Sequence, residues 1–221
     1  HAEPRVQATE LLLQERVPKD RALYSNNPDL VDLRALPEAA EPPVRVFTTP
    51  DTPTPGVQLL SNGRYHVMVT NAGGGYSRWR EIAVTRWRED VTCDAWGTFC
   101  YVRDRETGDL WSTAYQPTGR EPDDYEVIFA PDRVVFRRVD GEIETRTEIV
   151  VSPEDEAELR RVSITNHGSR SRSLDVASYA EVVLAPPDAD LSHPAFSNLF
   201  VETRRVPDRD ALVCTRRPRA G

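Results

Sequence analysis

Residues 73–79 combine a glycine run with side chains that suit a sugar ligand, in the order Gly73, Gly74, Gly75, Tyr76, Ser77, Arg78 and Trp79. Glycines allow a tight bend or the close approach of a neighbouring group. The two aromatic faces suit the apolar side of a sugar ring, while the hydroxyl and the guanidinium suit its hydroxyl groups. At this point a structural turn, with Tyr76 and Trp79 in the core and Arg78 solvated, explains the same residues.

Aromatic residues are densest just after this run, and all four tryptophans lie between Trp79 and Trp111. At a strand end Trp87 and Trp96 would form a platform for a sugar, and on one face of a sheet they would be core. Arginines flank Trp87 on both sides. We expect these arginines to lie on a solvated face, paired with nearby acidic residues.

The common catalytic and nucleotide motifs are missing. No Gly-Lys-Ser/Thr follows the glycines, and their spacing is not that of a dinucleotide site. The four histidines lack metal-ligand spacing, and the three cysteines form no CxxC pair. Glycoside chemistry needs two carboxylates, but the candidate pairs Asp123/Asp124, Glu154/Asp155 and Asp188/Asp190 are explained by exposed loops. We therefore expect no catalytic residue, metal or cofactor in this chain.

Composition narrows the partners and the compartment. The 221 residues carry a formal net charge of −8, which argues against nucleic acid or an anionic membrane as a partner. Unpaired cysteines fit a reducing compartment. We find no signal peptide and no apolar run that could span a bilayer. A start at His1 rather than Met indicates an excerpt from a longer protein.

The elements that position these residues are predicted to be almost all β. Residues 1–43 are expected to form a short helix (4–16) and an extended arm, and residues 44–221 a sandwich domain. Alternating apolar residues and turn signals every eight to twelve residues favour a large antiparallel two-sheet sandwich. The predicted strands are 57–61, 64–71, 80–87, 97–103, 110–115, 125–130, 133–139, 143–151, 157–166, 172–184, 198–205 and 211–215. A helical turn is expected in the connection 188–200.

Several long segments, taken in order, resemble the cyclic β-1,2-glucan synthases. The matching segments are Leu59–Trp79, Val84–Asp90, Asp94–Phe99, Leu110–Thr113 and His193–Phe200. The resemblance is specifically to the N-terminal β-sandwich of a phosphorylase-like module, which belongs with the cellobiose and chitobiose phosphorylases in glycoside hydrolase family 94. It extends over essentially the whole chain.

This resemblance implies a fold and a partner. The fold would be a supersandwich like that of galactose mutarotase, and inverting phosphorolysis would take place in a separate (α/α)₆ barrel. The domain would shape the site for β-1,2-glucan or a gluco-oligosaccharide and contribute to a homodimer interface. It would lie on the cytoplasmic side of a bacterial inner-membrane enzyme. The expected sugar contacts are Asn71, Gly73, Gly74, Gly75, Tyr76, Ser77, Arg78, Trp79, Trp87 and Trp96.

Three functions remain open at this stage. The chain is a non-catalytic domain of a glucan-processing enzyme, a stand-alone carbohydrate-binding module, or a purely structural and dimerisation domain. A mutarotase-type enzyme rests on fold analogy alone, and the sequence shows no obvious His/Glu acid–base pair.

Overall fold

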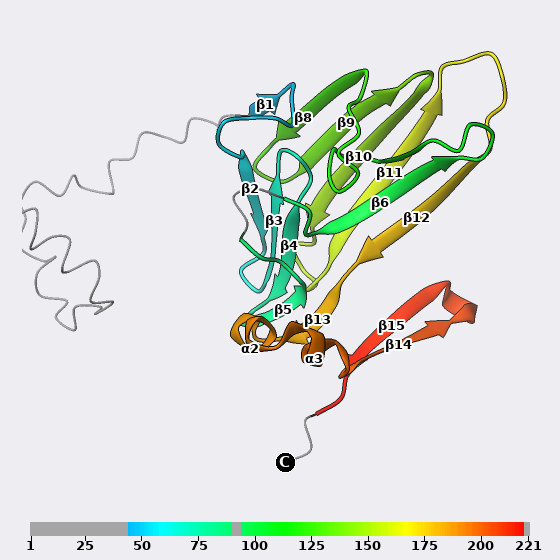
Figure 1. Ribbon diagram of the computed structural model, residues 1–221. Helices are drawn as coiled ribbons and strands as arrows, with labels where there is room; N and C mark the ends of the chain where they lie inside the picture. The colour runs from blue at the N-terminus through cyan, green and yellow to red at the C-terminus, as the bar shows by residue number, and fades with distance from the viewer. Residues whose placement is uncertain (1–43, 90–93, 219–221) are drawn as a thin grey trace, which may run out of the picture. The chain divides into compact units, whose positions relative to one another are not determined.

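Alternating apolar residues build an antiparallel β-sandwich of two layers (Figure 1). The computed structural model describes residues 44–89 and 94–218, so the predicted N-terminal helix and arm lie outside the described residues. The described part confirms the predicted all-β sandwich.

The first layer is one five-stranded sheet in the order β1-β8-β9-β10-β11. Tyr125, Val127 and Phe129 alternate along β8 and are all buried, as expected for a strand with one face in the core. Gly141 takes φ +58° in the tight turn between β9 and β10, a conformation that hairpin turns require and glycine adopts readily. The strands are β1 (Arg45–Phe47), β8 (Asp124–Phe129), β9 (Val134–Asp140), β10 (Ile143–Val151) and β11 (Glu158–Asn166).

The second layer consists of two separate sheets, in the orders β13-β5-β4-β3-β2 and β12-β6-β7. In the five-stranded sheet of this layer, Leu60, Val67 and Val69 pack on Val127 and Phe136 of the opposite layer. In the three-stranded sheet of this layer, Val102 and Trp111 form another core cluster with Ile143 of the opposite layer. The strands are β2 (Val57–Ser61), β3 (Tyr65–Thr70), β4 (Gly75–Trp79), β5 (Ile82–Thr85), β6 (Thr98–Asp104), β7 (Leu110–Ser112), β12 (Leu174–Ala180) and β13 (Val182–Ala185).

Two predicted strands are wrong in their bounds. The strand expected at 80–87 is shortened to β5, because Arg80 adopts φ +49° and closes a hairpin between β5 and β4, a strand that was not predicted. The strand expected at 172–184 divides at Glu181, because β12 pairs with β6 and β13 with β5. The three-residue β1 was not predicted. The remaining predicted strands agree with the structure to within a few residues.

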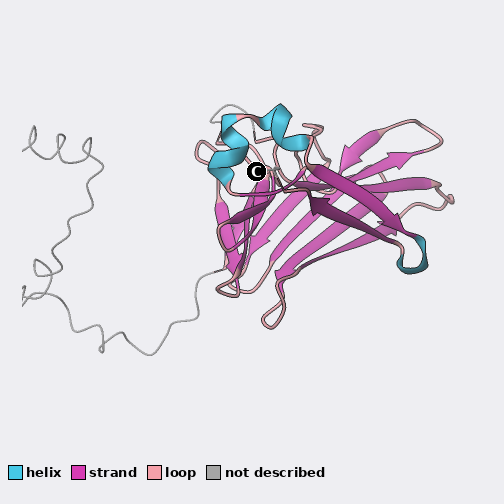
Figure 2. Ribbon diagram, turned by 90° about the horizontal axis from the view of Figure 1, so that it is seen from below, coloured by secondary structure: helices cyan, strands magenta, loops and turns pink. Residues whose placement is uncertain are grey.

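The connection after β13 contains two short helices, α2 (Pro187–Ser192) and α3 (Pro194–Asn198), where the sequence predicts a helical turn. They lie together at one end of the strands, beside β5 and β13 (Figures 1 and 2). A two-stranded hairpin follows, formed by β14 (Val201–Val206) and β15 (Ala211–Arg216) with the short 3₁₀ turn η3 (Pro207–Arg209) at its tip. None of the helices in residues 44–89 and 94–218 is long and apolar enough to cross a membrane.

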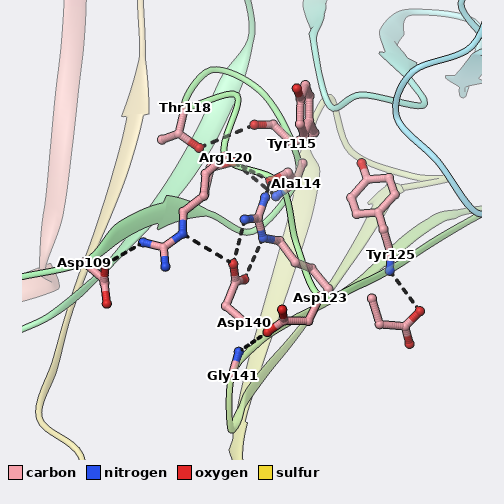
Figure 3. A network of polar contacts seen from close by, with 12 residues as sticks. Asp109, Ala114, Tyr115, Thr118, Arg120, Asp123, Tyr125, Asp140 and Gly141 are labelled. Carbon is pink, nitrogen blue, oxygen red and sulfur yellow. Dashed lines mark hydrogen bonds and ion pairs between the residues drawn. The ribbon is translucent and has the colours of Figure 1, made fainter. Parts of the chain in front are cut away.

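A buried ionic network fixes the loop that follows β7 (Figure 3). Arg138 is fully buried; its Nε and Nη2 donate to the two oxygens of Asp140 at 2.6 and 2.7 Å, and its Nη1 donates to the carbonyl of Ala114 at 2.8 Å. Arg120 joins this network through Asp140, 4.0 Å away, and donates to Asp109 at 3.0 Å. Ala114 in turn packs on Gly73, so the network fixes a residue that contacts the glycine run.

Candidate functional site

The three glycines of the run are buried and serve close packing. A Cβ at Gly74 would lie 1.9 Å from Oδ1 of Asp94, and one at Gly73 would lie 2.4 Å from the Cβ of Ala114. At Gly75 the obstacle is the carbonyl oxygen of Met68, also at 1.9 Å. Each distance is far shorter than a carbon contact allows. The glycines therefore let neighbouring groups approach the backbone of the turn.

The turn is fastened to the segment that carries Trp96. The Gly75 N–H donates to the Trp96 carbonyl at 2.7 Å. Thr70 donates its hydroxyl to Asp94 and accepts a hydrogen bond from the Gly74 N–H at 3.0 Å. Burial raises the pKa of Asp94, and the hydrogen bonds from Thr70 and Gly74 only partly offset this. These bonds fix Trp96 relative to β4.

Asn71 has a structural position as well. Its side chain is 1% exposed, accepts from the Gly56 N–H at 2.8 Å and donates to the carbonyls of Thr49 and Pro50. Its own carbonyl accepts from the hydroxyl of Tyr125 at 2.8 Å. Asn71 thus ties the start of the turn to two loops.

Strand β4 presents its side chains to alternate faces. Ser77 and Trp79 pair across the strands with Val67 and Tyr65, which are core residues, so they lie on the inner face. The Ser77 hydroxyl donates to Glu158 of the other layer at 2.6 Å. Tyr76 and Arg78 lie on the outer face.

The outer face of β4 and β5 forms a cleft of about 420 Å³ against α2. Tyr76 and Trp87 meet edge to face in it, with ring centroids 5.6 Å apart and planes at 62°. The Arg78 guanidinium lies 5.3 Å from the centre of the Tyr76 ring. Pro187 and Leu191 of α2 add apolar wall. The cleft therefore combines aromatic rings with guanidinium donors, which is the chemistry of a sugar site.

Arg86 forms the buried base of this cleft and is 5% exposed. It donates to both oxygens of Asp190 at 2.8 and 2.9 Å, to Glu181 at 2.6 Å and to Asn198 at 2.5 Å. Burial alone would raise the pKa of Asp190, but hydrogen bonds from Arg86 and Ser197 outweigh it and lower the pKa. The pair anchors α2 and α3 to the end of β5.

Arg88 has no such anchor. Its guanidinium lies 5.6 Å from the centre of the Trp96 ring, and its buried Nε has no hydrogen-bond partner. Among the residues that the structure describes, neither Arg78 nor Arg88 forms an ion pair with a carboxylate. Both arginines therefore bring to the cleft guanidinium groups that are not ion-paired within the described residues.

The structure brings together only some of the predicted contacts. Tyr76, Arg78 and Trp87 border the cleft, and Ser77 also lies along it, although its hydroxyl is bonded to Glu158 on the inner face. Asn71 and the glycines hold the turn behind it. Trp79 is 37% exposed, lies under the Arg80 guanidinium on the opposite face of β4, and does not line the cleft. Trp96 lines a separate cavity.

The solvated pairing expected for the arginines beside Trp87 is wrong for Arg86, and Asp190 is not an exposed loop acid. Arg86 is buried and pairs with Asp190, which is 104 residues away in the sequence. Only the fold brings these two residues together, so no local pattern could reveal the pair. The described residues contain no group of three or more His, Cys, Asp or Glu side chains that could hold a metal ion.

Comparison with known proteins finds a matching family model and several relatives. Residues 40–221 match the family model described as glycosyl hydrolase 94, supersandwich domain. The chain is 40% identical over 223 residues to the cyclic beta-(1,2)-glucan synthase NdvB of Rhizobium meliloti (strain 1021), covering all of this chain and 8% of that protein. It is 34% identical over 142 residues to N,N'-diacetylchitobiose phosphorylase of Vibrio furnissii, covering 62% of this chain and 18% of that enzyme. With 3-O-beta-D-glucopyranosyl-beta-D-glucuronide phosphorylase of Paenibacillus borealis it is 32% identical over 131 residues, covering 59% and 16%.

Proposed function

The chain belongs to the glycosyl hydrolase 94 supersandwich family, and from this premise we propose that it is the non-catalytic, sugar-contacting domain of a cyclic β-1,2-glucan synthase. In this role it shapes the site of a phosphorylase-like module that acts on β-1,2-glucan. The observation that carries the proposal is the cleft of Tyr76, Arg78, Trp87 and Arg88. Its ligand would be a stretch of β-1,2-glucan or a gluco-oligosaccharide.

Exposed apolar side chains support a role within a larger protein. The β14–β15 hairpin leaves Leu212 70% exposed, and Val176 on β12 and Leu199 after α3 are exposed as well. An isolated two-stranded hairpin is marginally stable in water, and exposed apolar groups of this kind mark contact surfaces. This chain spans less than a fifth of the three relatives named above. We propose that the hairpin and β12 contact other parts of the full protein, among them an (α/α)₆ barrel.

Two further parts of the proposal come from the resemblance. The domain would lie on the cytoplasmic side of the inner membrane, where the parent enzyme would draw on its sugar substrates. A homodimer interface would place further surface of the domain in contact with a second copy.

Replacing Trp87 with alanine in the full-length protein tests the sugar contact. Losing roughly 60 Å² of stacked indole face at about 25 cal/mol per Å² removes about 1.5 kcal/mol of binding free energy. We therefore expect about tenfold weaker binding of β-1,2-gluco-oligosaccharides by isothermal titration. Trp79→Ala is the matched variant, because Trp79 lies outside the cleft, and we expect it to bind as the parent does.

The outcomes separate the competing functions. Weaker binding by Trp87→Ala alone supports the cleft. Unchanged binding by both folded variants would contradict the sugar contact and leave a purely structural domain. Titration of the 221-residue chain by itself then addresses the stand-alone module, which requires measurable binding without the rest of the enzyme.

A further inference from the structure

A second aromatic cavity of about 380 Å³ shares Arg86 with the cleft. Its walls include Trp96, Tyr101 and Tyr179, which come from the loop before β6, from β6 and from β12. The rings of Tyr101 and Tyr179 lie 6.3 Å apart at 70°. Tyr179 is 46% exposed, so a large aromatic surface faces solvent there.

Polar groups in this second cavity are held in fixed positions. Glu181 accepts from the Tyr179 hydroxyl at 3.1 Å and from Arg86 at 2.6 Å, and a third of its side chain remains exposed. A carboxylate has about four lone-pair sites, so Glu181 can still accept from a ligand hydroxyl. The cavity thus offers an aromatic platform beside a charged acceptor, a combination that suits a neutral sugar.

The two cavities are joined through two arginines. Arg86 lines both of them and is immobilised by Asp190 and Glu181. Arg88 lines the first cavity while its guanidinium lies over the ring of Trp96, which lines the second. Each cavity has the volume of an ordinary small-molecule site. Arg86 is therefore the residue that the two cavities share, and Arg88 links the first cavity to Trp96 of the second.

We propose that the two cavities are successive subsites for one gluco-oligosaccharide that crosses Arg86, so the domain selects chains longer than a disaccharide. This inference rests on the proposed function of the Trp87 cleft. An oligosaccharide that is bound in the first subsite can then occupy the second without a separate association step. The affinity of the whole oligosaccharide therefore rises, although the affinity of each subsite alone is unchanged.

The test is a length series of linear β-1,2-gluco-oligosaccharides, from the disaccharide to the octasaccharide, titrated into the full-length protein. We expect affinity to rise at least tenfold once the chain is long enough to enter both cavities. Tyr179→Ala should remove this length-dependent gain and leave disaccharide binding unchanged. Tyr179→Phe keeps the ring and should retain most of the gain. Thermal melting confirms that each variant folds.

The outcomes distinguish this inference from the proposed function. If Trp87→Ala weakens binding at every length while Tyr179→Ala matches the parent throughout the series, the second subsite is refuted and the first stands. If Tyr179→Ala loses the length gain while Trp87→Ala changes nothing, the second cavity is a sugar site and the proposed cleft is not. A parent protein whose affinity does not depend on length refutes the inference directly.

Discussion

Replacing Arg86 with methionine should destabilise the fold strongly, because it leaves the buried carboxylate of Asp190 without its ion-pair partner. Arg86 is 5% exposed and the side chain of Asp190 is 8% exposed, with two hydrogen bonds between them. Removing one partner of such a pair costs about 3–5 kcal/mol. For a chain of this size that corresponds to a melting temperature lower by about 6–20 °C.

The assay is chemical denaturation of the chain followed by tryptophan fluorescence, with two comparison variants. Arg103→Met breaks an exposed pair with Asp175, whose two side chains are 58% and 46% exposed, and should change stability by less than about 1 kcal/mol. The double variant Arg86→Met/Asp190→Leu removes both charges and should recover most of the loss, because no buried charge is left unpaired. Glu181 also loses its partner, but it is partly solvated.

Acid titration gives a second measure of the same pair. The folded pKa of Asp190 is lowered, so its stabilising contribution is present above the ordinary pKa range of aspartate and is lost as the pH falls through the folded value. Asp190→Asn should lack this part of the acid dependence. The reasoning is refuted if Arg86→Met costs less than about 1 kcal/mol, or if the double variant is no more stable than Arg86→Met.

Three further outcomes follow from single contacts. Gly74→Ala should destabilise the chain by more than about 1 kcal/mol in denaturation, because its Cβ would lie 1.9 Å from Asp94, and Asp94→Ala in the same chain should relieve the clash. Burial and, to a lesser extent, the nearby carboxylate of Glu158 raise the pKa of Tyr65 to about 12. The free energy of unfolding should therefore fall by on the order of 2–3 kcal/mol between pH 10 and 12. Tyr65→Phe should remove that fall. Arg138→Lys keeps the charge but loses the two-pronged contact with Asp140, and a loss of at least about 1 kcal/mol is expected; an unchanged melting temperature would contradict it.

Local patterns in the sequence were sufficient to predict the strands but not how they divide into sheets. Alternation along residues 65–70 and 124–129 predicts strands with one buried face. Both strands form, and β8 has one buried face, whereas β3 also buries Met68 and Thr70 on its other face. The break at Glu181 was missed because 172–184 is continuous in pattern, and the division depends on which neighbour each half pairs with. The hairpin between β4 and β5 was also missed, because nothing in the sequence indicates that the backbone of Arg80 adopts a left-handed conformation.

The candidate site could be predicted only in part, and the glycine run shows why. Three glycines are compatible with a backbone exposed to a ligand and equally with a backbone packed against side chains. The deciding groups are Asp94, Ala114 and the Met68 carbonyl, and two of these come from other segments. Tyr76 and Arg78 were found because residue type alone suggested their chemistry. Trp79 was included for the same reason, although side chains alternate between the two faces of β4 and Trp79 lies on the face opposite Tyr76 and Arg78.

The site lies where the second layer of the sandwich separates into two sheets. Strand β12 leaves its neighbour β6 and continues as β13 beside β5, and Glu181 stands at the break. Backbone groups at such a break lose their ladder partners, and an unpaired buried polar group is costly. Arg86 supplies the missing contacts: its N–H donates to the Glu181 carbonyl at 2.8 Å and its guanidinium to the Glu181 carboxylate. The same separation leaves aromatic residues of both sheets unburied, Trp87 on one side and Tyr179 on the other. The residue that stabilises the break also lines both cavities, so we expect the stability of this region and the geometry of the proposed sugar site to be coupled.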